Sequence, residues 1–232
     1  MIGKITDIET MGSADGPGVR LVLFLSGCKL RCLYCHNPET WNLSAYRQEI
    51  TPIEVLKLYQ KYSIYYGNNG GVTFSGGEPL MQSEFVLETA KLLKQHNIHI
   101  ALDTAGVGDN YEELLQLVDL VILDIKSVDE DEYKMITGQE MTKFNQFVSK
   151  CQQLNKKVWL RQVIVPGIND DEQHILKLKE FASKLTNVER IELLPYHSMG
   201  RAKYDELGIQ YRLNDTPDMD KDRCKQLEQL LK

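Results

Sequence analysis

Long apolar segments are missing from this sequence of 232 residues. The longest uninterrupted apolar run is the stretch 21–25, whereas a helix needs about 20 such residues to span a bilayer. The first residues also lack the apolar stretch of a secretory signal peptide. We therefore expect a cytoplasmic protein that has no membrane partner.

An excess of basic residues is missing as well. The chain has 27 Lys and Arg against 33 Asp and Glu, which gives a net charge of −6. This balance argues against a protein that binds nucleic acid by neutralising phosphates. With 42% apolar and 26% charged residues, the composition is that of a globular protein rather than a disordered chain. A chain of this length can fold without disulfides or a structural metal.

Apolar, β-branched runs alternate with helical patterns along the chain. Strands are predicted at 19–25, 71–75, 98–103, 120–125, 158–165 and 188–194, and helices at 51–62, 83–95, 111–117, 129–135, 142–154, 171–185 and 217–231. Strands that are each followed by helix imply right-handed βαβ units and a parallel sheet. Near-continuous apolar strands are typical of a sheet buried on both faces. The pattern alone leaves a doubly wound open sheet and an incomplete barrel as alternatives.

Polar residues and glycines follow several of these predicted strands. They are Gly76, Gly77, Glu78, Asp103, Thr104, Asp124, Lys126, Tyr196 and His197. In both alternative folds the carboxyl ends of parallel strands meet at one face, where ligands bind. We therefore expect these residues to surround a common site.

Three of the five cysteines lie close together, at Cys28, Cys32 and Cys35. Their spacing matches one face of a helix, so they could be core residues. However, Gly27 and Pro38 bracket a segment that is too short for a stable helix. In a reducing compartment such a group indicates metal binding or redox chemistry rather than a disulfide framework.

A structural zinc site would need four ligands. His36 directly follows Cys35 and cannot easily share a metal with it. Cys151 and Cys224 occupy apolar positions of predicted helices, so we interpret them as buried thiols. Three thiolates on one loop suit an iron–sulfur cluster. A four-iron cluster held by three cysteines leaves one iron open, and an open position is typical of a catalytic metal.

Two motifs carry a family resemblance. The three cysteines are spaced C-x3-C-x2-C, with the aromatic Tyr34 directly before the last one, and residues 76–79 read Gly-Gly-Glu-Pro. Together they resemble the radical S-adenosylmethionine superfamily. The strings at 15–20, 35–41, 163–167 and 193–197 extend the resemblance to the activating enzymes of glycyl-radical enzymes. No cysteine lies between the cysteine motif and the Gly-Gly-Glu-Pro segment, so the sequence is similar to compact activating enzymes that lack a ferredoxin-like insert.

The resemblance implies a fold and a reaction. The expected fold is α/β, a single domain over residues 1–232 shaped as an incomplete (β/α)6 barrel with parallel strands, which is a partial TIM barrel. The expected cofactors are a [4Fe–4S] cluster and S-adenosylmethionine. The enzyme would cleave S-adenosylmethionine reductively and take a hydrogen atom from a glycine Cα of its partner. That partner would be a glycyl-radical enzyme of the pyruvate formate-lyase type, the electron donor a flavodoxin or ferredoxin, and the enzyme itself a monomer.

The resemblance also assigns roles to individual residues. Iron would be bound by Cys28, Cys32 and Cys35. Contacts to S-adenosylmethionine would come from Tyr34, His36, Asn37, Gly76, Gly77, Asp124, Ile125, Lys126 and His197. A monovalent cation would lie near Asp103, Thr104 and Asp124. Glu78 would orient its own loop, whereas Arg161 and Asp15 would face the glycine loop of the partner.

Two other functions remain open at this point. One is a radical S-adenosylmethionine enzyme that acts on a small molecule, and the other is a non-enzymatic zinc-binding module. The open face of a six-unit barrel favours a polypeptide substrate. A colourless, zinc-loaded protein after anaerobic reconstitution with iron and sulfide would indicate the zinc module.

Overall fold

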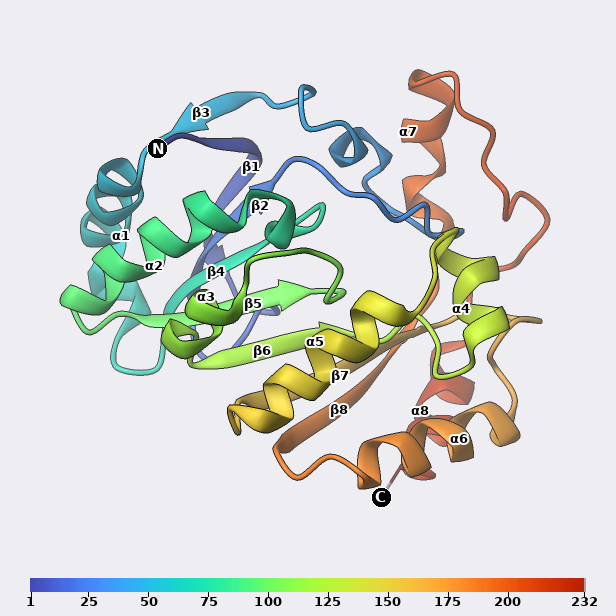
Figure 1. Cartoon of the computed structure of the whole chain (residues 1–232). Helices are drawn as coiled ribbons and strands as arrows, with labels where there is room; N and C mark the ends of the chain where they lie inside the picture. The colour runs from blue at the N-terminus through green and yellow to red at the C-terminus, as the bar shows by residue number, and fades with distance from the viewer. Residues whose placement is uncertain (232) are drawn as a thin grey trace.

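The computed structural model describes residues 1–231, and in this range the chain forms one eight-stranded sheet (Figure 1). The strand order is β3-β1-β2-β4-β5-β6-β7-β8. The strands are β1 (Gly3–Gly12), β2 (Arg20–Leu25), β3 (Gln48–Ile50), β4 (Gly71–Gly76), β5 (His99–Thr104), β6 (Leu120–Asp124), β7 (Lys157–Ile164) and β8 (Val188–Pro195). Strands β2 and β4 to β8 are parallel. These are the predicted strands, so the α/β class and the parallel order are confirmed.

The sheet curves but does not close, because β3 and β8 remain as its two edges. The parallel strands follow one another in sequence order, without the reversal that defines a doubly wound sheet, so the partial barrel is confirmed over the open doubly wound alternative. The β8 edge is covered by helix α8, where Glu228 accepts a hydrogen bond from the Leu193 N–H at 3.1 Å. Covering an edge strand in this way prevents it from pairing with another chain. That the chain is one domain over 1–232 stays a prediction, and residue 232 lies outside the described range.

The antiparallel edge formed by β1 and β3 was not predicted. β1 pairs antiparallel with β2, and β3 pairs antiparallel with β1. β1 mixes buried and exposed residues, and β3 has only three residues. A half-exposed strand and a very short strand carry weak hydrophobic patterns, so apolar runs in the sequence do not identify these two elements.

Helices follow each parallel strand and, apart from α7, lie on the outside of the curved sheet (Figure 1). They are α1 (Pro52–Tyr66), α2 (Ser83–Gln95), α3 (Glu112–Leu117), α4 (Glu130–Thr137), α5 (Thr142–Gln153), α6 (Glu172–Ser183), α7 (Arg201–Glu206) and α8 (Lys221–Gln229). Helix α8 begins four residues later than predicted, because Asp220 caps it by accepting the Arg223 N–H. Helix α7 was not predicted. Within residues 1–231, no helix combines the length and apolar character that crossing a membrane requires.

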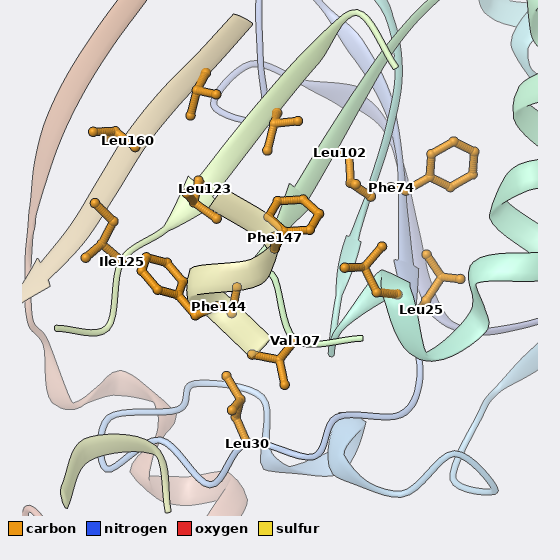
Figure 2. Close-up of a cluster of buried hydrophobic side chains, with 14 of the residues drawn as sticks. Leu25, Leu30, Phe74, Leu102, Val107, Leu123, Ile125, Phe144, Phe147 and Leu160 are labelled. Atoms are coloured by element: carbon orange, nitrogen blue, oxygen red, sulfur yellow. The ribbon is translucent and has the colours of Figure 1, made fainter. Parts of the chain in front are cut away.

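The main core lies between the sheet and the helices. Figure 2 shows Leu102, Leu123 and Leu160 of neighbouring strands on the same side as Phe144 and Phe147 of α5. Leu30, from the cysteine segment, belongs to the same buried cluster. Each such side chain contributes about 1.5–3 kcal/mol when it is fully buried. The cysteine segment is thus anchored to the core through an apolar residue within the motif itself.

Candidate active site

A cavity of about 200 Å³ lies at the carboxyl ends of the parallel strands. Its lining includes the predicted residues Cys28, Cys32, Tyr34, Cys35, His36, Asn37, Gly76, Gly77, Asp103, Thr104, Asp124 and Lys126. The structure therefore brings together residues from the cysteine segment and from three strand ends. Ile125 and His197 do not line this cavity. A larger surface cavity of about 410 Å³, beside Met81 and Phe85, contains none of the predicted site residues.

The cysteine segment follows β2 and is held by backbone hydrogen bonds. Gly27 N–H donates to the Thr40 carbonyl at 2.7 Å, and Arg31 N–H donates to the Thr137 carbonyl at 2.8 Å. A side chain on Gly77 would place its Cβ 2.5 Å from the Gly27 carbonyl oxygen. Glycine is therefore required at position 77, because the two loops approach each other too closely for a side chain.

All three cysteines of the motif are free thiols. Burial raises the pKa of Cys28 to about 12 and that of Cys32 to about 11. A cysteine binds metal as the thiolate, so a bound cation would have to lower these raised pKa values. Among residues 1–231, no three His, Cys, Asp or Glu side chains converge as ligands of a single metal ion. An iron–sulfur cluster fits these thiols better, because each thiolate then binds a different iron.

Glu78 organises the loop that follows β4. Its side chain is 1% exposed and accepts hydrogen bonds from Thr104 Oγ1 at 2.6 Å and from Ala105 N–H at 2.9 Å. Burial raises the pKa of Glu78 to about 7, although these hydrogen bonds favour the charged form. Glu78 therefore connects the loops after β4 and β5, which is the orienting role predicted for it.

Lys126 is 8% exposed and lies just beyond the end of β6. Its Nζ donates to Asp124 Oδ2 at 2.5 Å and lies 5.5 Å from the centre of the Tyr34 ring. Burial would lower the pKa of Lys126, but Asp124 and its other neighbours raise it well above the usual value. Burial and the nearby Asp124 raise the pKa of Asp103 to about 6. The cavity thus places one fixed positive charge among carboxyl groups.

His36 and His197 stack with ring centres 4.1 Å apart. His36 Nε2 is also 2.8 Å from the His197 carbonyl oxygen, and burial lowers the pKa of His36. His197 Nδ1 is buried and has no hydrogen-bond partner among the described residues. Ile125 is fully buried, and its N–H donates to the Arg161 carbonyl. Contacts of His197 and Ile125 with S-adenosylmethionine stay predictions.

Two further assignments also stay predictions. At the predicted cation site, the Thr104 hydroxyl donates a hydrogen bond to Glu78 and accepts one from the Gly106 N–H. Both hydrogen bonds already engage the hydroxyl that a cation would contact. Arg161 binds Glu192 Oε2 at 2.9 Å and the Ala14 carbonyl at 2.5 Å. Arg161 therefore holds the loop that contains Asp15, the other residue expected to face the partner.

The sequence analysis missed a C-terminal segment that packs on the cysteine motif. Lys203 Nζ donates to Asn37 Oδ1 and to Glu39 Oε1, both at 2.6 Å, and Tyr204 Oη donates to the Cys35 carbonyl at 3.0 Å. Figure 1 shows α7, which contains these two residues, beside the cysteine segment. No local motif marks this contact, since α7 has only six residues. We refer to Lys203 and Tyr204 as the α7 clamp.

Comparisons with known proteins now add to this geometry. Residues 22–178 match the family model described as the radical SAM superfamily. The chain belongs to this superfamily. It also belongs to the family of pyruvate formate-lyase-activating enzymes, because two such proteins match nearly its full length. The one from Clostridium pasteurianum is 49% identical over 100% of this chain and 98% of its own length. The one from Staphylococcus epidermidis is 41% identical over 97% and 93%.

A solved structure agrees with these relatives. A crystal structure of a domain of pyruvate-formate lyase-activating enzyme from Bacteroides vulgatus has a TM-score of 0.57 and 26% identity, and the match covers 70% of this chain and 92% of that one. Membership makes the chain a radical S-adenosylmethionine enzyme whose cofactors are a [4Fe–4S] cluster and S-adenosylmethionine. The non-enzymatic zinc module is therefore wrong.

Proposed function

We propose that this chain activates a glycyl-radical enzyme of the pyruvate formate-lyase type by taking a hydrogen atom from one glycine Cα of that partner. One observation carries the proposal: the three cysteines, the Gly-Gly turn and Lys126 line a single cavity in a chain that is 49% identical to such an activating enzyme over its whole length. The full-length match to activating enzymes favours this function over chemistry on a small molecule.

Cys28, Cys32 and Cys35 would hold the cluster through three of its irons, which leaves the fourth iron without a protein ligand. When bound, the cluster supplies the electron that cleaves S-adenosylmethionine into methionine and a 5′-deoxyadenosyl radical. The rest of the protein binds, orients and shields the reactants. Leu30 and the α7 clamp support the segment that carries the three ligands.

Lys126 would bind the methionine carboxylate, since opposite charges attract strongly in a site with little water. The Lys126 ammonium already donates a hydrogen bond to Asp124 Oδ2 at 2.5 Å, so the incoming carboxylate would share this ammonium with Asp124. Asp103, Asp124 and this carboxylate would then surround one lysine. A monovalent cation near Asp103, Thr104 and Asp124 would offset the excess negative charge.

The adenosine would lie against Tyr34, His36 and Asn37 on one side of the cavity, with His197 stacked behind His36. Aromatic rings favour the face of a planar base. Gly76 and Gly77 allow the backbone to approach the ligand, because neither residue has a Cβ. Ile125 would contribute through its backbone alone, since its side chain is buried in the core.

The partner and the electron donor would both act at the open side of the barrel. Arg161 and the Asp15 loop would meet the glycine loop of the partner, and a flavodoxin or ferredoxin would supply the electron. The enzyme would act as a monomer. The cysteines form no disulfide, and three of them are grouped as cluster ligands, which supports a reducing, cytoplasmic location.

The test is to combine the anaerobically reconstituted enzyme with a reductant, S-adenosylmethionine and pyruvate formate-lyase. We expect a glycyl radical by electron paramagnetic resonance, and deuterium in 5′-deoxyadenosine when the partner glycine carries deuterium at Cα. A partner with Gly→Ala at the radical position serves as the control and should transfer none. Cleavage of S-adenosylmethionine without radical formation in any glycyl-radical partner would contradict the proposal.

A further inference from the structure

A polar network begins at Ser127, directly after Lys126 in the chain, and has no part in the roles given above. Ser127 is fully buried, and its hydroxyl donates to Glu132 Oε2 at 2.5 Å while accepting the Asp129 N–H at 2.9 Å. The same Glu132 oxygen lies 3.3 Å from His174 Nδ1. Glu132 belongs to α4 and His174 to α6, so the network connects the residue after Lys126 to two helices.

The hydrogen-bond roles in this network follow from its chemistry. Burial would raise the pKa of Glu132, but hydrogen bonds from His174 and Ser127 hold it below its usual value. Glu132 is therefore a carboxylate, which only accepts hydrogen bonds, so His174 Nδ1 must carry a proton. On the other side of the ring, His174 Nε2 lies 3.1 Å from Gln162 Oε1 of β7. Both ring nitrogens thus lie within hydrogen-bond distance of a side chain from another element.

Hydrogen bonds hold the residues on both sides of Lys126 in the chain. On one side, the Ile125 N–H donates to the Arg161 carbonyl at 2.7 Å. On the other side, Ser127 is held by the network. The direction in which Lys126 leaves the backbone, and hence the place of its ammonium in the cavity, depends on both sets of hydrogen bonds. Without His174, the half-buried carboxylate of Glu132 loses a donor, and its segment is expected to shift toward water or another partner.

We propose that Ser127, Glu132 and His174 are positioning residues that hold Lys126 at the carboxylate of S-adenosylmethionine. This inference rests on the proposed function, and it extends the binding site to residues that do not touch the ligand. Changes within a packed network typically alter affinity at a connected site by roughly three- to thirtyfold. The effect is specific, because it acts through Lys126, the residue proposed to bind the carboxylate.

The test compares two ligands on the reconstituted holoenzyme under anaerobic conditions, by equilibrium dialysis. One is S-adenosylmethionine and the other is its decarboxylated form, which lacks the group that Lys126 binds. His174→Phe removes both ring nitrogens, and we expect roughly three- to thirtyfold weaker binding of S-adenosylmethionine with unchanged binding of the decarboxylated form. His174→Asn keeps a donor near the position of Nδ1 and should restore most of the affinity.

Glu132→Leu removes the acceptor shared by Ser127 and His174, and so tests the same network from its other end. It should show the same selective loss of affinity for S-adenosylmethionine, also where His174→Phe fails to fold. Thr89→Val is the matched control, because it removes a buried hydrogen bond to the Phe85 carbonyl on α2, outside the cavity. Both affinities should be unchanged in this control.

The inference is wrong if the network variants weaken both ligands equally, since that result indicates general loosening. It is also wrong if they weaken neither. A wild-type enzyme that cleaves S-adenosylmethionine but binds the two ligands equally would overturn the role of Lys126 and the network with it, while leaving the reaction intact. A wild-type enzyme that produces no 5′-deoxyadenosine would instead overturn the proposed function together with this inference.

Discussion

One wall of the cavity is a loop and the opposite wall is the end of a sheet. The loop carries Cys28, Cys32 and Cys35 and is fixed by distant segments, among them the α7 clamp. The sheet wall carries Asp103 of β5 and Asp124 of β6, and the parallel pairing of these two strands sets their spacing. Strand register gives the sheet wall its geometry before any ligand binds. The loop wall depends on long-range side-chain contacts and on the cluster that its thiols hold.

The two walls should therefore fail in different ways. Changes in the loop wall should remove or destabilise the cluster. Changes in the sheet wall should weaken S-adenosylmethionine binding while the cluster stays in place. Cluster content and ligand affinity are separate measurements, so each variant can be assigned to one wall or the other.

The largest effect is expected for the cysteines. Cys32→Ala should abolish both cluster assembly and activity, because the cluster then keeps only two protein ligands. The measurement is iron content and visible absorption after anaerobic reconstitution. Cys151→Ala and Cys224→Ser are the controls, since these thiols are buried on α5 and α8, outside the cavity, and should leave the cluster intact. Loss of the cluster in the Cys224 variant but not in the Cys32 variant would reverse the ligand assignment.

Lys126→Met tests the sheet wall. Removing a buried, charge-assisted hydrogen bond typically costs about 2–3 kcal/mol, so the dissociation constant for S-adenosylmethionine should rise roughly 30- to 150-fold. The cluster absorption should be unchanged, because Lys126 is not a ligand of iron. Equilibrium dialysis of the reconstituted enzyme measures the affinity. A Lys126→Met enzyme that cannot assemble the cluster would remove the distinction between the two walls.

The sheet wall was largely predictable from the sequence. Apolar runs identify the parallel strands, and a parallel sheet brings their carboxyl ends to one face. Asp103, Asp124 and Lys126 were expected there for that reason, and the structure places all three at one cavity. The local signal was sufficient because each of these residues directly follows a strongly apolar strand.

The supports of the loop wall were not predictable in the same way. Lys203 and Asn37 are 166 residues apart in the sequence, and α7 is too short for a clear helical pattern. Contacts at such a separation depend on the packing of the whole chain. The antiparallel β1 and β3 were not predicted for a related reason, because β1 is half-exposed and β3 has only three residues, so both carry weak hydrophobic patterns.

Asp103→Asn tests the electrostatics of the sheet wall through pH. The pKa of Asp103 is raised from 3.8 to about 6, mainly by burial. A raised carboxyl pKa gives stability that is present below pH 3.8 and is lost as pH rises through about 6. Across this pH window, the free energy of unfolding of the wild type should therefore fall by about 2 kcal/mol relative to that of Asp103→Asn. One pKa unit corresponds to about 1.4 kcal/mol, and water partly screens this half-buried group. Denaturant unfolding of both proteins at several pH values measures the difference, and parallel pH profiles would contradict it.

The smallest effect is expected at the α7 clamp. Tyr204→Phe removes the hydroxyl that donates to the Cys35 carbonyl at 3.0 Å, and a hydrogen bond of this kind contributes about 1 kcal/mol. The cysteine segment should open more often, so the cluster should be lost to an iron chelator about fivefold faster, while the affinity for S-adenosylmethionine is unchanged. Tyr211→Phe is the matched control, because its hydroxyl pairs with Tyr196 rather than with the cysteine segment. Equal rates of cluster loss in the two variants would mean that general packing of the C-terminal segment, and not the hydrogen bond to Cys35, supports the loop wall.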